Sequence, residues 1–239
     1  MNKPKRILIQ MAMFDEARPL REIFNFTQEQ FAHDSVLFDL YKTTVDQNIL
    51  YLVIPKKCHR YDVSRVGSQM AALVAWAAIE LLQPDLMINM GTAGGFQSKG
   101  AKIGDVYLAD KATYHDREFH PIRDAFKKYS VGDYPVCFDE KWVTALALKK
   151  GIVSSGNRML LIDADAKQME KNQAVAKDME AAAIAEVTEL KNIPIIILKS
   201  ITDLVDIKQS SHEQFDQNFH LAVEQLIKKA QGLILLLGK

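Results

Sequence analysis

Apolar residues recur along the chain with two alternating periods. Short runs rich in branched and aromatic residues predict strands over 6–13, 35–42 and 48–55. Residues 68–83, "SQMAALVAWAAIELLQ", instead form a long run of good helix formers. Their surface is apolar almost all round, which is typical of a helix packed on a sheet. The next run, "LMINM" (86–90), predicts a buried strand that leads directly into "GTAGG".

The pattern is weaker in the middle of the chain. Residues 104–119 alternate between polar and apolar positions and predict one or two strands. Residues 120–138 show no regular period, so we expect an irregular segment there. A helix is predicted over 140–150, followed by a strand and turn over 151–156.

A clear alternation of helix and strand returns in the last third. Residues 178–192 predict a helix with Asp178 as its N-cap, and 194–203 predict a central strand. From Phe215 onward, apolar residues recur at helical spacing and predict a long closing helix. An earlier helix is predicted over 15–26. With no repeat or linker visible, we expect residues 1–239 to form one α/β domain with a mainly parallel or mixed sheet.

Composition and charge limit the possible partners. The chain has 239 residues, of which 48% are hydrophobic and 25% charged, as in a soluble globular protein. Its 30 basic and 30 acidic side chains give a formal net charge of zero. This balance argues against nucleic acid as a partner and mildly favours self-association.

The cysteine and hydropathy patterns indicate a cytoplasmic protein. Cys58 and Cys137 lie far apart and match no metal-binding or redox spacing, so we expect a reducing compartment. The first apolar run is too short for a signal peptide. The longest apolar stretch, 71–82, contains Glu80 and is too short to cross a bilayer, so no membrane association is expected.

Acidic residues lie where an α/β fold binds its ligands. Ligands of such folds occupy the carboxyl ends of the strands. This rule selects Glu16 after the first strand, the segment 91–95, and Asp203 at the end of 194–203. A buried carboxylate at a strand end costs free energy unless it is paired or used. Glu16 and Glu180 also fit an ordinary structural role as acids in the first turn of a helix.

Three carboxylates around one apolar crevice suit the cleavage of an N-glycosidic bond. That reaction passes through a transition state that resembles an oxocarbenium ion. One acid must protonate the leaving base, a second must activate water, and a third is suited to the ribose hydroxyl groups. Burial raises the pKa of the proton donor, which keeps it protonated near neutral pH.

Two further motifs carry weaker signals. "GTAGGFQSKG" fails as a P-loop because Ala101 follows Gly100 where lysine is required. It fits either a tight turn or main-chain amides placed close to a small ligand. "YHDREFH" contains His115, Asp116 and His120, whose spacing matches no standard metal site. We expect a polar loop or subunit contact there, and no metal or cofactor.

Four motifs in the same order along the chain resemble a known family. "MINMGTAGGF", "AKDMEAAAIAEV" and "LKSITDLVD" resemble the signatures of the purine nucleoside phosphorylase and nucleosidase superfamily. Together with "MAMFDEA" they are most similar to the 5'-methylthioadenosine/S-adenosylhomocysteine nucleosidases of the plant-like type. The resemblance runs from Ile7 to about Val223 and is weakest over 127–154. It implies a three-layer α/β sandwich with a mixed central sheet, usually assembled as a homodimer.

The resemblance also implies roles for individual residues. Asp203 is expected to protonate adenine at N7, and Glu16 to activate the attacking water. Glu180 is expected to bind the ribose hydroxyl groups, with Met179 packed against the sugar. Further substrate contacts are implied at Thr92, Ala93, Gly94, Met159, Leu160, Lys199 and Met13. Residues 212–215 are a further candidate for the pocket of the 5' substituent.

Two other functions fit the same fold. A phosphorylase needs a phosphate site, and the Glu16 carboxylate would repel phosphate, so hydrolysis is favoured. A non-catalytic nucleoside-binding protein is the other alternative, although none of the three acids is lost. The substrates in question are 5'-methylthioadenosine, S-adenosylhomocysteine, 5'-deoxyadenosine and 6-amino-6-deoxyfutalosine, which differ at the 5' end. The plant-like motifs favour methylthioadenosine.

Overall fold

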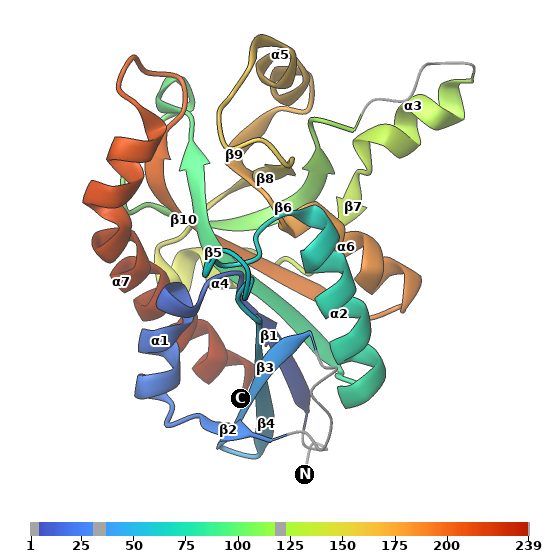
Figure 1. Ribbon diagram of the computed structural model, residues 1–239, viewed down its shortest axis with the longest axis vertical. Coiled ribbons are helices and arrows are strands. Elements are labelled where there is room, and N and C mark those ends of the chain that lie inside the picture. The colour runs from blue at the N-terminus through green and yellow to red at the C-terminus, as the bar shows by residue number, and fades with distance from the viewer. Residues whose placement is uncertain (1–4, 31–36, 118–122, 239) are drawn as a thin grey trace.

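The computed structural model describes residues 5–30, 37–117 and 123–238 (Figure 1). The strands are β1 (Arg6–Gln10), β2 (Thr27–Glu29), β3 (Phe38–Val45), β4 (Asn48–Pro55), β5 (Leu86–Gly95), β6 (Val106–Tyr114), β7 (Tyr134–Pro135), β8 (Lys149–Ser155), β9 (Ala174–Asp178) and β10 (Ile195–Leu204). The helices are α1 (Phe14–Ile23), α2 (Ser68–Leu82), α3 (Asp124–Val131), α4 (Glu140–Leu146), α5 (Asp163–Lys171), α6 (Ala181–Leu190) and α7 (Ser211–Leu237), with a 3-10 turn, η1, at Gln97–Lys99.

These strands form one mixed sheet in the order β10-β6-β8-β9-β5-β1-β4-β3-β2, and β7 pairs with β6. Strand β5 pairs in parallel with β1 and β10 and antiparallel with β9. Strand β10 also pairs with β6, which continues through β8 to β9. The pairing therefore closes β5, β10, β6, β8 and β9 into a ring, and β5 is shared by the ring and the open part of the sheet.

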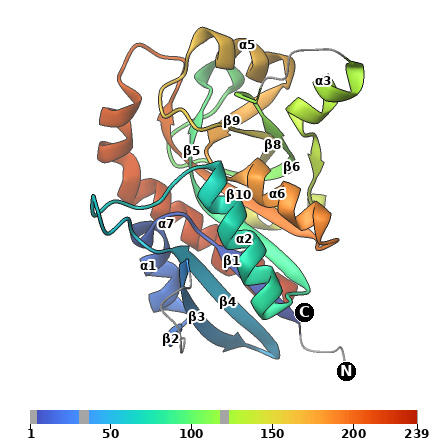
Figure 2. The same ribbon diagram turned by 45° about the vertical axis from the view of Figure 1, so that its right-hand side comes forward.

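Helices cover both faces of the sheet and complete three layers. Helices α2 and α6 pack on one face, and α1 and α7 on the other (Figures 1 and 2). Each face has its own buried apolar cluster. On α7, Leu226 and Leu233 are fully buried, whereas Leu73 and Trp76 on α2 are about half exposed. The predicted three-layer α/β sandwich is confirmed.

Several predicted boundaries were wrong in the middle of the chain. Residues 120–138, expected to be irregular, contain α3 and β7 among their described residues, and α3 extends away from the sheet (Figure 1). The helix expected over 140–150 ends at Leu146, because Ala147 adopts a left-handed conformation with φ of 46°. Lys149 and Lys150 then begin β8. Helix α5 and strand β9 had no predicted counterpart.

Other boundaries moved by a few residues. The first strand ends at Gln10, and the strand expected over 86–90 continues through Gly95, so "GTAGG" is not a turn. Asp178 ends β9 rather than starting a helix, and α6 begins at Ala181. Asp178 nevertheless caps α6, because its Oδ2 accepts a hydrogen bond of 2.9 Å from the Ala181 N–H.

Two remaining features concern the thiols and the apolar segments. Cys58 and Cys137 are free thiols, and both are partly exposed. Across the described ranges, no helix combines the length and apolar character needed to cross a membrane. The 27-residue helix α7 instead packs its apolar stripe against the sheet.

Candidate active site

A cavity lies at the carboxyl ends of the parallel strands β1, β5 and β10, beside the last residues of the antiparallel strand β9. It encloses about 720 Å³ with its open mouth included. The lining residues are Ala12, Met13, Glu16, Val66, Met90, Gly91, Thr92, Ala93, Gly94, Met159, Lys177, Asp178, Met179, Glu180, Lys199, Thr202, Asp203, Val205 and Phe215. The three acids selected from the sequence therefore meet in one mainly apolar cavity.

Glu16 is held by a neighbour on a different element. It lies in the first turn of α1 and is 2% exposed. Its Oε1 accepts hydrogen bonds from the N–H and the hydroxyl group of Thr92, at 2.8 and 2.7 Å. Its Oε2 is buried and has no hydrogen-bond partner among the described residues. Burial raises the pKa of Glu16, against the opposing effects of Thr92 and the Lys199 charge.

Asp203 lies near the end of β10 and is largely buried. Its Oδ1 accepts a hydrogen bond of 2.8 Å from the Thr202 hydroxyl group. Burial raises the pKa of Asp203, while the Thr202 and Ser211 hydroxyl groups and the Lys177 charge oppose the increase. On β5, a Cβ added to Gly94 would lie 3.1 Å from Asp203 Oδ2 and 2.5 Å from Val205 Cγ1. The carboxyl group therefore needs a glycine beside it.

Glu180 immediately precedes helix α6 and is also buried. Its Oε1 accepts a hydrogen bond of 2.9 Å from the Gly67 N–H. Gly67 has φ of +108°, a conformation that residues with a side chain rarely adopt. Burial raises the pKa of Glu180 to about 7, although the Lys199 charge lowers it. The carboxyl group therefore changes charge close to neutral pH.

Lys199 supplies positive charge behind these acids. Its Nζ lies 2.7 Å from Asp178 Oδ2, and both side chains are almost completely buried. Asp178 also accepts a hydrogen bond from the Ser155 hydroxyl group. Burial lowers the pKa of Lys199, but Asp178 and Glu180 together raise it above its ordinary value. A charged lysine of this kind offsets the cost of burying several carboxylates.

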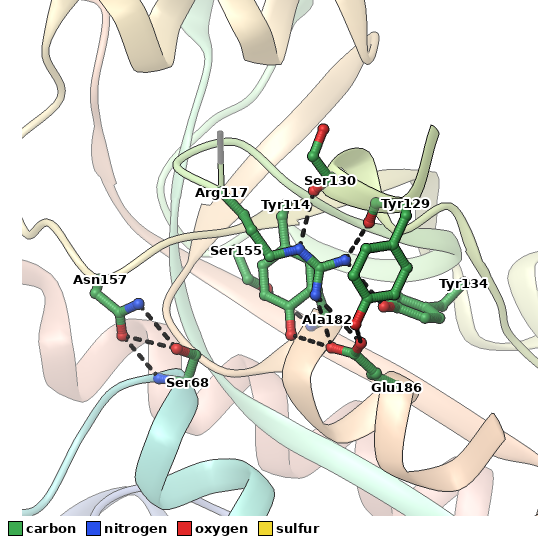
Figure 3. A network of polar contacts seen from close by, with 10 residues as sticks. All are labelled: Ser68, Tyr114, Arg117, Tyr129, Ser130, Tyr134, Ser155, Asn157, Ala182 and Glu186. Carbon is green, nitrogen blue, oxygen red and sulfur yellow. Dashed lines mark hydrogen bonds and ion pairs between the residues drawn. The ribbon is translucent and has the colours of Figure 1, made fainter. Parts of the chain in front are cut away.

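A short loop after β8 borders the cavity and is tied to α2. Oδ2 of Asp116 accepts a hydrogen bond of 2.6 Å from the Asn157 N–H. Oδ1 of Asn157 accepts hydrogen bonds from the N–H and hydroxyl group of Ser68, at 2.9 and 3.0 Å (Figure 3). Ser68 follows Gly67, whose N–H binds Glu180. The loop and the acid are therefore held by adjacent residues.

The same loop is also bound from β9. Nζ of Lys177 donates hydrogen bonds to the carbonyl oxygens of Arg158 and Met159, at 2.6 and 3.0 Å. Met159 lines the cavity. Leu160, which the resemblance also assigned to the substrate, is 66% exposed and is not among the lining residues.

The described residues of the "YHDREFH" motif make contacts beside this region. His115 is buried, its Nδ1 lies 3.2 Å from Ser154 Oγ, and burial lowers its pKa. Arg117 pairs with Glu186 on α6 at 2.9 Å, within a group of tyrosines (Figure 3). His120 lies outside the described residues. Within the described part of the chain, no group of three or more His, Cys, Asp or Glu side chains is placed to hold a metal ion.

The structure adds lining residues that sequence reasoning missed. Lys177 and Asp178 directly precede Met179, so their position in the motif was an available signal. Val66 lies far from the other motifs in the sequence and gave no local signal. In the segment expected near the 5' substituent, Phe215 lines the cavity, whereas the His212 side chain is 76% exposed and lies 3.6 Å from Asp216.

Comparisons with known proteins agree with this arrangement. A model of the phosphorylase superfamily matches residues 6–235. The 5'-methylthioadenosine/S-adenosylhomocysteine nucleosidase of Arabidopsis thaliana is 35% identical over 224 residues, which are 92% of this chain and 87% of that protein. The 5'-methylthioadenosine nucleosidase of the same plant is 35% identical over 233 residues, which are 95% of this chain and 85% of that protein. The solved apo structure of Arabidopsis thaliana 5'-methylthioadenosine nucleosidase has a TM-score of 0.93 at 32% identity and covers 98% of this chain and 96% of that one.

Proposed function

Because this chain belongs to the phosphorylase superfamily, we propose that it hydrolyses the N-glycosidic bond of 5'-methylthioadenosine to adenine and 5-methylthioribose. The family membership confirms the resemblance indicated by the four sequence motifs. The observation that carries the proposal is the meeting of Glu16, Glu180 and Asp203 in one cavity. S-adenosylhomocysteine and 5'-deoxyadenosine are the other candidate substrates.

Asp203 is the proposed acid. Burial raises the pKa of its carboxyl group, which favours the protonated form that a proton donor needs. As the bond between C1' and N9 breaks, its electron pair moves into the adenine ring and the Asp203 proton is transferred to N7. Met159 lines the cavity and is proposed to contact the base.

Glu16 is the proposed base. Thr92 fixes its Oε1, and the unpartnered Oε2 is free to accept a proton from water. The water oxygen then bonds to C1' on the face opposite the leaving base. This use requires the ionised carboxylate. Burial disfavours that form, and the Thr92 hydrogen bonds and the Lys199 charge oppose the effect of burial.

The remaining contacts position the sugar and its substituent. Glu180 as a carboxylate is a suitable acceptor for the ribose hydroxyl groups. Met179 is adjacent to it and is proposed to pack against the sugar. Met13, Val66 and Phe215 give the cavity apolar surface suited to a methylthio group.

The lining argues for water rather than phosphate as the nucleophile. Among the described residues that line the cavity there is no arginine, and Arg18 on α1 is exposed and absent from the lining. Of the two lining lysines, Lys199 is paired with Asp178 and Lys177 is bound to two carbonyl groups. A phosphate dianion beside Glu16 would be repelled by its carboxylate.

The test is adenine release from 5'-methylthioadenosine in phosphate-free buffer, compared with the same buffer containing phosphate. The sugar product is identified by mass. We expect free methylthioribose at a rate independent of phosphate. A phosphate-dependent rate with a ribose 1-phosphate product would identify a phosphorylase. Binding without release in either buffer would identify a nucleoside-binding protein.

A homodimer is also part of this proposal. Leu73 and Trp76 on the outer side of α2 are 54% and 45% exposed, and Leu190 on α6 is 70% exposed. Apolar side chains of this size on one side of a protein favour burial against a partner. Light scattering should give twice the chain mass, and Leu73→Glu should shift the protein toward monomer. A monomeric wild type would exclude the dimer.

The free thiols support a cytoplasmic location, because such groups persist under reducing conditions. Cell fractionation tests this assignment directly. Recovery of the protein outside the cytoplasmic fraction would contradict it.

A further inference from the structure

Lys177 and Asp203 lie on either side of one glycine in the wall of the cavity. Gly94 of β5 pairs with Lys177 of β9 and with Asp203 of β10. A shift in register after Ile201 brings Asp203, rather than Thr202, opposite Gly94. Neighbouring strands are about 4.8 Å apart, so two strand spacings separate the main chains of Lys177 and Asp203. Since Gly94 has no side chain, nothing from the intervening strand separates the two charged groups.

Lys177 is a buried cation, only 6% exposed. Four carboxylates on different elements act on it, namely Asp203 on β10, Asp178 on β9, Asp165 on α5 and Glu180 before α6. Burial outweighs them and lowers its pKa, and the field of Lys177 in turn helps to keep His115 neutral.

Three of these carboxylates have other partners. Asp178 is paired with Lys199, and Asp165 Oδ1 lies 2.7 Å from a guanidinium nitrogen of Arg158. Glu180 accepts a hydrogen bond from the Gly67 N–H. Among the described residues, the Thr202 and Ser211 hydroxyl groups and the charge of Lys177 act on Asp203 and oppose the rise in its pKa. Lys177 is therefore the counter-charge of the proposed acid.

We propose that Lys177 is a positioning residue for the end of the cavity that holds the adenine ring. Its ammonium group holds the carbonyl groups beside Met159, and its charge stabilises the carboxylate that Asp203 becomes on giving up its proton. This inference rests on the proposed function, in which that proton moves to N7 of adenine. Negative charge then appears on Asp203 while the C1'–N9 bond breaks, and a nearby fixed cation lowers the cost of that step.

The two contributions of Lys177 are chemically separable. A glutamine at 177 keeps an N–H donor for the carbonyl groups but removes the charge. An arginine keeps the charge. Loss of the charge raises the pKa of Asp203, so the acid stays protonated to higher pH but gives up its proton less readily.

The experiment compares wild type, Lys177→Gln and Lys177→Arg, with Lys171→Gln on the exposed side of α5 as the matched control. The kinetic parameters kcat and kcat/KM for 5'-methylthioadenosine are measured from pH 4.5 to 9. We expect Lys177→Gln to lower kcat at least tenfold. We also expect the descending limb of its pH–rate profile to shift to higher pH by about one unit. Lys177→Arg should leave the limb in place, and Lys171→Gln should match wild type.

If kcat falls in Lys177→Gln but the descending limb of the pH–rate profile stays at the wild-type pH, the inference is overturned, because a purely structural role predicts that result. Absence of adenine release by the wild type would refute the proposed function itself. If Lys177→Gln does not fold, the double variant Lys177→Gln/Asp203→Asn decides the question. Recovered folding in the double variant supports electrostatic coupling of the two groups, and continued misfolding contradicts it.

Discussion

Oε1 of Glu16 accepts two hydrogen bonds from Thr92, one from the main-chain N–H at 2.8 Å and one from the hydroxyl group at 2.7 Å. The two residues are 76 positions apart and belong to α1 and β5. The contact fixes the carboxylate against the sheet and leaves Oε2 without a partner among the described residues. A base that is held in place before the substrate arrives has less to reorganise during reaction.

Thr92→Val should weaken catalysis without disturbing the fold, because it removes the hydroxyl donor and keeps the N–H donor and the shape. A hydrogen bond to a charged group is worth about 1.5–3 kcal/mol, so we expect kcat to fall roughly 10- to 100-fold. Steady-state kinetics with 5'-methylthioadenosine measures the effect. Thr92→Ser keeps the hydroxyl group and serves as the control. A valine variant as active as wild type would remove Thr92 from the positioning of Glu16.

Asp203→Asn should lose most turnover and keep nucleoside binding, because the amide preserves the shape but supplies no acidic proton. General acid catalysis contributes about 10²- to 10⁴-fold, which sets the expected loss in kcat. Binding is measured by calorimetry with 5'-methylthioadenosine. Asp216→Asn on α7, where the aspartate side chain is 65% exposed, is the matched control and should be unaffected. Unchanged turnover in Asp203→Asn would exclude Asp203 as the acid.

Glu180→Gln should stabilise the substrate-free protein at higher pH. The pKa of Glu180 is raised from 4.5 to about 7 in the folded state, so its contribution to stability is complete below about pH 4.5 and is lost as the pH rises toward 7. The amide of glutamine does not ionise, so the variant keeps its stability as the pH rises. Its amide oxygen can still accept the hydrogen bond from the Gly67 N–H. We expect the advantage of Glu180→Gln to grow between pH 4.5 and 7 to at most about 3 kcal/mol.

Thermal unfolding of both proteins across this pH range measures the difference. The same variant should bind the ribose hydroxyl groups less well, which would appear as weaker binding of 5'-methylthioadenosine. A constant difference in Tm at every pH would contradict the assignment of the raised pKa to Glu180.

Lys199→Met should destabilise the fold strongly, because it leaves Asp178 buried without its cation. Loss of one partner of a buried pair typically costs about 3–5 kcal/mol. Adding Asp178→Asn should recover part of that loss. Urea unfolding at pH 7 measures the free energy in each variant.

Lys57→Met is the matched surface control. Lys57 lies 3.5 Å from Asp62, their side chains are 56% and 89% exposed, and such pairs contribute about 0–1 kcal/mol. Equal destabilisation by the two lysine substitutions would show that burial does not set the energy of the Lys199–Asp178 pair.

Local patterns were sufficient for most of the architecture. The period of the apolar residues located the strand over 48–55 and the helix over 68–82, because burial of one face or both faces is encoded residue by residue. Local patterns failed where the backbone conformation of a single residue ends an element. Ala147 in the left-handed region ends α4, and alanine gives no sequence signal for that conformation.

The sequence by itself determined the fold class, the family, the position of Glu16 after the first strand and that of Asp203 near the end of the last strand, since each depends on local order along the chain. Only the tertiary structure decided which groups meet. The Lys177–Gly94–Asp203 row requires β9 and β10 to pair with opposite edges of β5. The contact between Glu180 and Gly67 joins residues 113 positions apart. Periodicity records which face of an element is buried, whereas strand partners and register depend on packing over the whole chain.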